Sequence, residues 1–325
     1  MNLKESRTSI ENNLKYHLNL FAPNHKFREI YHYALIPPGK LFRPLLVSSI
    51  YNDFNTNRRE AGTDPTYTFD KNSNHALFMS SVEIHHAYTL IHDDLPCMDN
   101  DNMRRGKPSV HKKFGQWKAL LAGDGLLNAS YYLISRTKSP QTNQVIKLMS
   151  RFLGPSGLIQ GQVIDLLENT SNDFEMLLKM HEYKTARLIQ TSIMGSFLLL
   201  NRPQGRTLID LMKLGLHMGL AFQFIDDLSE LAEEKLESHE RKINPWLNHN
   251  KKSYHTLINS LSTVHKIIDR YELKNFSFVI HEYLSKMQSI IKKGENNIHL
   301  HLESVKCHDF DLESISKLNA SDENP

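Results

Sequence analysis

Two groups of acidic residues in this 325-residue chain stand among apolar neighbours. The first group comprises Asp93, Asp94 and Asp99, and it is followed by Arg104 and Arg105. Carboxylates are rarely placed among apolar residues unless a cation or hydrogen bonds compensate for their desolvation. Carboxylate oxygens suit hard cations such as Mg²⁺, and a bound cation attracts phosphate. The pattern therefore predicts a site for a divalent metal and a phosphorylated substrate.

The second group comprises Asp226, Asp227 and Glu230. On an ideal helix Asp226 and Glu230 lie one turn apart, with roughly 6 Å of rise between them, so both side chains project from one face. That spacing suits a shared divalent ion. A lone Asp-Asp or Arg-Arg pair is usually an ordinary solvated surface, but two acidic groups in apolar segments, with arginines directly after one, favour a functional site.

Helical geometry constrains the first group. Asp93 and Asp99 would lie on different faces of an ideal helix. Pro96 lies between them, and a proline has no N–H to donate while its ring clashes with an earlier carbonyl. We therefore expect the chain to bend at Pro96, so that Asp99 returns toward Asp93. Upstream, His86 shares the face of Asp93 after almost two turns, whereas His85 points away.

Basic residues alternate with the acidic ones. The guanidinium forks of Arg104 and Arg105 suit bidentate contacts with diphosphate oxygens. Lys40 and Arg43 form a second basic pair upstream. The alternation predicts two diphosphate subsites, one held through metal and the other mostly by cations.

These side chains must be positioned by helices, because apolar residues recur at intervals of three and four and strand signals are scarce. Helices are predicted at residues 45–51, 76–91, 120–135, 176–200, 208–231, 257–271 and 276–291. We expect an all-α bundle forming a single domain over residues 1–307. The polar segment 52–74 reads as a surface connection, and the polar tail 308–325 is predicted to be disordered.

Composition excludes several function classes. The chain has 39 lysines and arginines against 36 aspartates and glutamates, and the basic residues are scattered, which argues against a nucleic-acid partner. The two cysteines favour a reducing, cytoplasmic compartment. The longest clean apolar run, residues 197–200, is far shorter than the roughly 20 residues that span a bilayer. Zinc-site and P-loop motifs are missing from the sequence, so side chains and a divalent metal would have to bind diphosphate.

Over residues 35–245 the sequence resembles the trans-prenyltransferases, or polyprenyl synthases, and most closely the bacterial farnesyl diphosphate synthases. The matching motifs are Gly39-Lys40-x-x-Arg43-Pro44, Glu83-x-x-His86, Asp93-Asp94-Leu95-Pro96, Arg104-Arg105-Gly106-Lys107-Pro108, Leu121-Ala122-Gly123-Asp124, Gly161-Gln162-x-x-Asp165-Leu166, Lys184-Thr185 and Phe222-Gln223-x-x-Asp226-Asp227.

The resemblance implies an isoprenoid-synthase-type helical bundle around a central apolar cavity. It implies head-to-tail condensation of isopentenyl diphosphate with dimethylallyl or geranyl diphosphate, giving farnesyl diphosphate by Mg²⁺-assisted ionisation. It also implies a homodimer without a membrane span. A geranyl diphosphate synthase, a weakly active or non-catalytic regulatory homologue, and a terpene cyclase of the same fold remain alternatives. A cyclase would not need an isopentenyl diphosphate subsite.

The resemblance also assigns roles by position. The implied Mg²⁺ ligands are Asp93, Asp94, Asp99, Asp226, Asp227 and Glu230. The implied ligands of the allylic diphosphate are Arg104, Lys184 and Lys242. The implied ligands of isopentenyl diphosphate are Lys40, Arg43, His86 and Arg105. Thr185 and Gln223 would direct oxygens toward the carbocation, and they complete a catalytic set with Asp93, Asp94, Asp99, Arg104, Lys184 and Asp226.

Product length would depend on the side chain that closes the apolar pocket. Tyr88 matches the position of an aromatic plug in family members with short products, although an ordinary core tyrosine is an equal alternative. Thr89 is better aligned with Asp93 on an ideal helix. C15 is the first expectation and C10 the second.

The sequence departs from the family pattern at the second acidic group. Glu230 stands where the family usually has Asp, and the segment before Lys242 is short and lacks the usual glycine. The extra methylene of Glu displaces its carboxylate, and Mg²⁺ tolerates displaced ligands poorly. Reduced activity is therefore expected.

Overall fold

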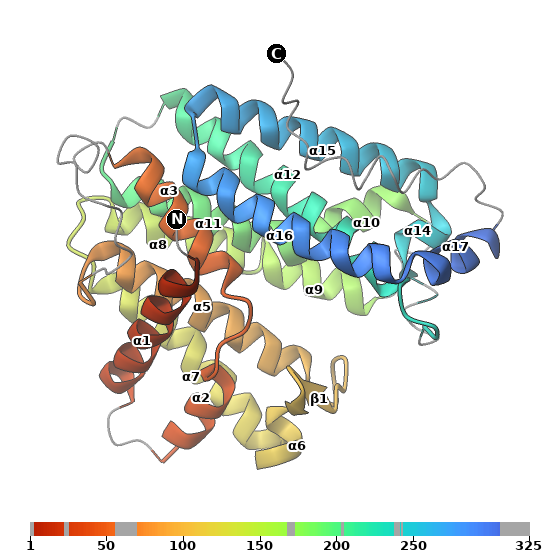
Figure 1. Cartoon of the computed structure of the whole chain (residues 1–325). Helices are drawn as coiled ribbons and strands as arrows, with labels where there is room; N and C mark the ends of the chain where they lie inside the picture. The colour runs from red at the N-terminus through yellow and green to blue at the C-terminus, as the bar shows by residue number, and fades with distance from the viewer. Residues whose placement is uncertain are drawn as a thin grey trace. The chain divides into compact units, whose positions relative to one another are not determined.

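The computed structural model describes residues 3–22, 26–55, 70–167, 173–202, 205–236, 241 and 243–305. These residues are almost entirely helical (Figure 1), which confirms the predicted all-α class. They group into two compact units. Unit 1 comprises Met1–Ser150 and Thr191–Gly205, and unit 2 comprises Arg151–Gln190 and Arg206–Pro325. The single domain over residues 1–307 stays a prediction, and the tail 308–325 lies outside the described residues, as does most of the segment 52–74.

Unit 1 is organised around one long helix. Its helices are α1 (Leu3–Phe21), α2 (Arg28–Leu35), α3 (Phe42–Phe54), α5 (Asn74–Asp93), α6 (Val110–Phe114) and α7 (Gln116–Ser135), joined by most of α8 (Thr142–Leu153) and of α11 (Arg187–Leu199). A short antiparallel hairpin pairs β1 (Met103–Arg104) with β2 (Lys107–Pro108). Helix α5 packs against α1, α3 and α7.

The sequence explains why α5 is central. Ser73 caps its first turn, because the Ser73 hydroxyl accepts a hydrogen bond from the Ala76 N–H at 3.2 Å. Most of its residues are buried around the whole circumference, as expected of a helix enclosed by others. The helix ends at Asp93, so its buried body fixes the start of the first acidic group.

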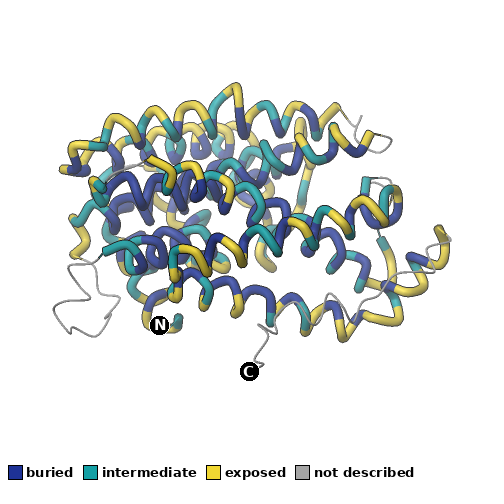
Figure 2. The backbone as a smooth tube through the Cα atoms, turned by 90° about the horizontal axis from the view of Figure 1, so that it is seen from above, coloured by how far each residue is buried: buried dark blue, intermediate teal, exposed yellow. Residues whose placement is uncertain are grey.

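Unit 2 contains the second acidic group. Its elements are α9 (Leu158–Leu166), α10 (Phe174–His181), the π-helical turn η1 (Glu182–Ala186), α12 (Gly205–Glu230), α14 (Pro245–Asn248), α15 (Asn250–Tyr271), α16 (Lys274–Lys293) and α17 (Glu295–Glu303). Helices of the described chain carry buried residues on one side and exposed residues on the other (Figure 2), as α15 and α16 do with their buried positions at intervals of three and four.

The ranges predicted to be helical lie within these helices or extend at most one residue past their ends, with one larger difference. Residues 176–200 were predicted as one helix, but the π-helical turn η1 interrupts it after His181. Helices pack closely around this turn, because a Cβ on Gly161 would overlap the backbone of Lys184 and one on Gly219 would overlap Ala186. Single π-helical turns are frequent at functional sites. The apolar period does not reveal such a turn.

Helix α12 is the one described helix that is long and apolar enough to cross a membrane, with a mean hydropathy of 1.3 over its most apolar window. Half of that window is buried inside the protein. The core helix of a soluble protein meets the same criteria, so this is weak evidence for a membrane span.

Candidate active site

The first acidic group forms a turn at the end of α5. Helix α5 ends at Asp93, and the Asp99 N–H donates to the Asp93 carbonyl at 2.9 Å. The chain therefore returns as predicted, although the helix ends before Pro96 instead of being loosened there. Asp94 is buried, with 2% of its surface exposed, whereas Asp99 is exposed.

Arg104 compensates for the buried carboxylate of Asp94. Its Nε and Nη2 donate to Asp94 Oδ1 at 2.8 and 2.5 Å, and Nη2 also donates to Asp101 Oδ2 at 2.5 Å. Burial raises the pKa of Asp94 above its ordinary value, and the hydrogen bonds from Arg104 oppose that rise. The sequence analysis assigned no role to Asp101, whose only signal is its position three residues before Arg104.

The β1–β2 hairpin turns the two arginines toward different partners. Its two turn residues, Arg105 and Gly106, both have positive φ, at 55° and 74°. Two such residues between paired strands form the tight turn that is favoured in hairpins. The hairpin is held to α2, because Lys107 Nζ donates to the Tyr33 carbonyl at 2.5 Å and the Tyr33 hydroxyl donates to the Pro108 carbonyl at 2.7 Å.

Two of the four residues predicted to bind a second anion, Arg43 and Arg105, lie about the buried carboxylate of Glu83, and a third, His86, lies beside Arg43. Arg43 Nη1 lies 3.3 Å from His86 Nε2, and Arg105 Nη2 lies 3.7 Å from Glu83 Oε1. Burial, followed by the charges of Arg43 and Arg105, holds the pKa of His86 well below its usual value. His86 is therefore neutral and can accept a hydrogen bond from Arg43. The fourth residue, Lys40, is exposed.

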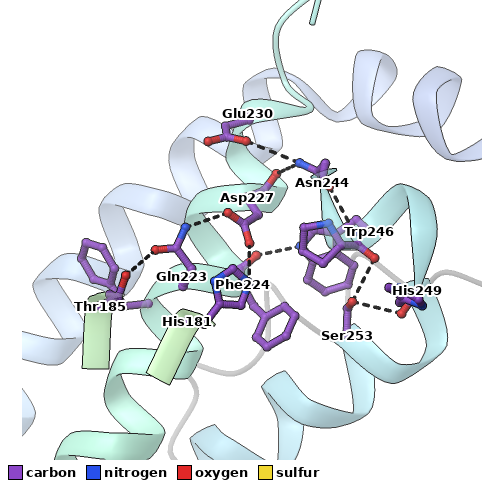
Figure 3. Close-up of polar contacts among 12 residues, drawn as sticks. His181, Thr185, Gln223, Phe224, Asp227, Glu230, Asn244, Trp246, His249 and Ser253 are labelled. Atoms are coloured by element: carbon purple, nitrogen blue, oxygen red, sulfur yellow. Dashed lines mark hydrogen bonds and ion pairs between the residues drawn. The ribbon is translucent and has the colours of Figure 1, made fainter. Parts of the chain in front are cut away.

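The second acidic group centres on Asp227, which is buried on α12 (Figure 3). Gln223 Nε2 donates to Asp227 Oδ1 at 2.8 Å, and Thr185 Oγ1 donates to Gln223 Oε1 at 2.9 Å. His181 Nε2 lies 3.4 Å from Asp227 Oδ2. Burial lowers the pKa of His181 to about 3, so the imidazole is neutral and this contact is not an ion pair.

The environment of the Asp227 carboxylate favours the binding of a cation. Burial, and then the charge of Glu230, raises the pKa of Asp227 well above its usual value. Its Oδ2 is buried and accepts no hydrogen bond within the described part of the chain. A buried carboxylate oxygen without a hydrogen-bond partner, on which the charges of neighbouring acids act, fits a Mg²⁺ ligand. Among the described residues, however, no three acidic, histidine or cysteine side chains are already gathered as a metal site.

Lys184 is held in the π-helical turn beside its own carboxylate partner. Its Nζ donates a short hydrogen bond to Asp165 Oδ2 at the end of α9. Asp165 belongs to a motif that the sequence analysis quoted without giving the residue a role. The other predicted lysine, Lys242, lies outside the described residues.

Asn244 and Trp246 anchor the last turns of α12 (Figure 3). Asn244 Nδ2 donates to the Asp227 carbonyl at 2.8 Å and lies 3.5 Å from Glu230 Oε2. Trp246 Nε1 donates to the Phe224 carbonyl at 2.7 Å. The sequence analysis gave neither residue a role, and the Asn-Pro dipeptide that marks a helix start was the only signal.

The two candidates for the pocket floor have different surroundings. Tyr88 is 6% exposed, and its ring centroid lies 4.6 Å from that of His85 and 5.7 Å from that of His92. Thr89 is half-buried and its hydroxyl donates to the His86 carbonyl at 2.9 Å. Tyr88 is thus a core residue of unit 1, and its role in product length stays a prediction.

Comparison with known proteins gives concordant results. The sequence profile of the polyprenyl synthetase family matches residues 24–270. Farnesyl diphosphate synthase of Bacillus subtilis (strain 168) is 31% identical over 273 residues, covering 82% of this chain and 86% of the relative. The enzyme of the same name from Geobacillus stearothermophilus is 33% identical over 242 residues, covering 72% and 76%. A geranyltranstransferase structure from Thermotoga maritima has a TM-score of 0.72 at 26% identity, covering 87% of this chain and 99% of that one.

Proposed function

The chain belongs to the polyprenyl synthetase family, and on that premise we propose that it is a farnesyl diphosphate synthase. It would join isopentenyl diphosphate head to tail with dimethylallyl and then geranyl diphosphate. One structural observation carries the proposal beyond the relatives' names: unit 1 has two neighbouring groups of cations, each beside its own buried carboxylate. Arg104 pairs with the acidic group, whereas Arg43 and Arg105 lie about Glu83. Two diphosphates need two such groups, and a terpene cyclase would not need the second.

The residues proposed to hold Mg²⁺ are Asp93, Asp94, Asp99, Asp226, Asp227 and Glu230. When bound, Mg²⁺ neutralises charge on the departing diphosphate and so favours breakage of the allylic C–O bond. Arg104 and Lys184 are proposed to bind the allylic diphosphate, exchanging their present carboxylate partners for diphosphate oxygens. Lys242 is proposed for the same role by its position alone.

Side chains around η1 would stabilise the carbocation. Thr185 and Gln223 are already linked by a hydrogen bond, and Gln223 is fixed in turn by Asp227. Oxygens held in this way stabilise positive charge without reorganising during the reaction. The isopentenyl double bond then attacks the allylic carbon, and the loss of a proton, for which the released diphosphate is the proposed base, restores a double bond. The apolar helices exclude water, which would otherwise trap the cation.

A product assay tests the proposal directly. Purified protein is incubated with Mg²⁺, isopentenyl diphosphate and either dimethylallyl or geranyl diphosphate, and product length is read by mass spectrometry. A C15 diphosphate is expected from both allylic substrates. A C10 product would favour the geranyl diphosphate synthase. The lack of product from folded protein would favour the non-catalytic homologue, for which the Glu230 substitution is the supporting observation.

Tyr88 is proposed to limit product length, because it is a buried aromatic residue about one and a half turns before Asp93 on α5. Tyr88→Ala should shift the product distribution beyond C15. Tyr254→Ala, which removes a half-buried tyrosine from α15, is the control and should leave the distribution unchanged. An unaltered distribution in Tyr88→Ala would remove Tyr88 from the pocket floor.

A homodimer is proposed through the outer face of α7. Trp117 is 60% exposed, Leu120 47%, Leu121 49% and Tyr132 41%. Exposed apolar residues gathered on one helix are typical of protein interfaces. Leu121→Glu should convert a dimer to a monomer in light scattering, and a monomeric wild-type protein would reject the proposal. The cytoplasmic location stays a prediction from composition.

A further inference from the structure

Glu83 is a buried carboxylate that the reaction described above does not use. It lies on α5, three residues before His86, so both side chains share one face of the helix. Only 3% of its surface is exposed. Its Oε1 lies 3.7 Å from Arg105 Nη2, and the charges of both Arg105 and Arg43 act on it. A buried carboxylate beside two guanidinium groups reduces their mutual repulsion and restricts where they can lie.

Gly39 faces the same guanidinium group. A Cβ built on Gly39 would lie 2.8 Å from Arg105 Cζ and 2.9 Å from Arg105 Nε. No side chain can occupy this position unless Arg105 moves. Glycine therefore leaves the guanidinium group in its present place, whereas a larger residue would displace the flexible end of Arg105.

The backbone conformation of Arg105 adds a third constraint. Arg105 occupies the left-handed region at φ 55°, in a tight turn that Lys107 holds to α2. The turn fixes the backbone of Arg105, while Glu83 and Gly39 determine where its guanidinium group lies. Three elements distant in the sequence thus specify the position of one cation.

The charge state of Glu83 is consistent with this arrangement. Burial raises the pKa of Glu83 to about 7, and the positive charges of Arg105 and then Arg43 oppose the rise. Because His86 is neutral, the group carries two positive charges and at most one negative charge. The group remains attractive to a diphosphate when Glu83 is ionised.

We propose that Glu83 and Gly39 are positioning residues for Arg105: Glu83 holds the guanidinium group in the isopentenyl diphosphate subsite before substrate arrives, and Gly39 leaves the space it occupies. This inference rests on the proposed function.

Glu83→Gln should raise the KM for isopentenyl diphosphate about tenfold, because a charge-assisted contact becomes a neutral one. The kcat and the KM for geranyl diphosphate should change less than twofold. Gly39→Ala should give the same pattern, since it displaces Arg105 without removing any polar group.

The test combines steady-state kinetics with calorimetric titration of isopentenyl diphosphate into the full chain. Arg105→Gln should weaken binding more than either variant, and Glu83→Gln in the Arg105→Gln background should add no further loss, because Glu83 acts through Arg105. Asp210→Asn is the control. It removes a buried carboxylate that accepts hydrogen bonds from Arg270 and Tyr271 at 2.8 and 2.9 Å, and it should leave both KM values unchanged.

The outcomes separate this inference from the proposed function. If wild-type protein binds isopentenyl diphosphate and Arg105→Gln weakens it, normal binding in Gly39→Ala and in folded Glu83→Gln overturns the inference alone. Additive losses in the double variant overturn it as well, since they show that Glu83 does not act through Arg105. If wild-type protein binds no isopentenyl diphosphate, the proposed function fails and this inference fails with it.

Discussion

The two acidic groups differ in how the protein compensates for their buried carboxylate. Asp94 is 2% exposed and receives two hydrogen bonds from Arg104. Asp227 is 6% exposed, receives one hydrogen bond from the Gln223 amide and faces the neutral imidazole of His181. Burial raises the pKa of both carboxyls, and only that of Asp94 is opposed by an arginine.

This difference indicates what each group needs from its ligands. In the first group Arg104 already pairs with the buried carboxylate of Asp94, so the cost of burying that charge is offset before metal or substrate binds. The second group leaves one buried carboxylate oxygen of Asp227 without a hydrogen-bond partner among the described residues. Burying an unpaired charge costs free energy. A bound cation should therefore stabilise the second group more than the first.

Both groups should be indispensable to turnover despite the difference. Asp93→Ala and Asp226→Ala should each lower kcat by about 10³-fold or more, because each removes a ligand that helps to stabilise the departing diphosphate. Both side chains are half-buried, so helical content by circular dichroism should stay unchanged. Asp269→Ala, on the exposed side of α15, is the control. Near-normal turnover in either variant would contradict the proposed role of its acidic group in turnover.

Acid should destabilise unit 1 through residues outside its acidic group. Burial lowers the pKa of His75 and His85 to about 3. The unfolded chain therefore binds protons below pH 6.5 while the folded protein does not, so stability is complete above pH 6.5 and falls toward pH 3. The slope is about 1.4 kcal/mol per pH unit for each histidine.

The measurement is denaturant unfolding as a function of pH. His85→Asn should flatten the loss of stability in acid, because it removes one of the buried rings whose pKa is lowered. His281→Asn, which changes an exposed histidine of α16, should not. Parallel pH profiles for wild type and His85→Asn would show that acid lability arises elsewhere.

The local sequence was sufficient to predict features set by neighbouring residues. The return of Asp99 to Asp93 was predicted from Pro96, and the chain does return, although the helix already ends at Asp93. His86, chosen by helical phase, lies beside Arg43, and its role in binding stays a prediction. Helix positions follow from the period of apolar residues. In each case the information lies within a few residues of the feature.

Features that depend on tertiary packing were missed. Glu83 and Gly39 are separated in the sequence from the arginine that they position, and no period connects them. Asn244 and Trp246 are known as anchors only once their side chains are seen to reach carbonyls of α12. The π-helical turn that carries Lys184 contains no residue type that would mark such a turn in the sequence. Sequence patterns predict which faces of a helix are buried. They do not predict which residue from a distant part of the chain packs against that face.

Neutralising the buried carboxylate should destabilise the protein at Asp94 but not at Asp227. Asp94→Asn loses charge-assisted hydrogen bonds with Arg104 and should cost about 1–3 kcal/mol. Asp227→Asn keeps an oxygen for the Gln223 amide and removes an uncompensated buried charge, so it should leave stability unchanged or raise it by about 1 kcal/mol.

Thermal unfolding in EDTA measures this contrast without metal. Mg²⁺ with inorganic pyrophosphate should then stabilise the wild type more than Asp227→Asn. Destabilisation of similar size in both variants would mean that Asp227 has a compensating partner, and the distinction between the groups would fail.

The smallest effect concerns the anchor of the second group. Asn244→Ser should cost about 1 kcal/mol, because serine still caps α14 but lacks the amide that donates to the Asp227 carbonyl. The same amide lies 3.5 Å from Glu230 Oε2, so its loss should also weaken Mg²⁺-pyrophosphate binding. The longer Glu side chain at position 230 would thus depend on Asn244 to keep its carboxylate in place.

A double-mutant cycle separates these two effects. Glu230→Asp shortens the side chain and withdraws it from Asn244, so Asn244→Ser in that background should still lower thermal stability but should no longer weaken Mg²⁺-pyrophosphate binding. An equal loss of binding in both backgrounds would show that Asn244 acts only through the end of α12. Coupling between the two positions would instead mean that Asn244 holds the longer Glu230 side chain in place, so that a neutral amide supports the second acidic group where Arg104 supports the first.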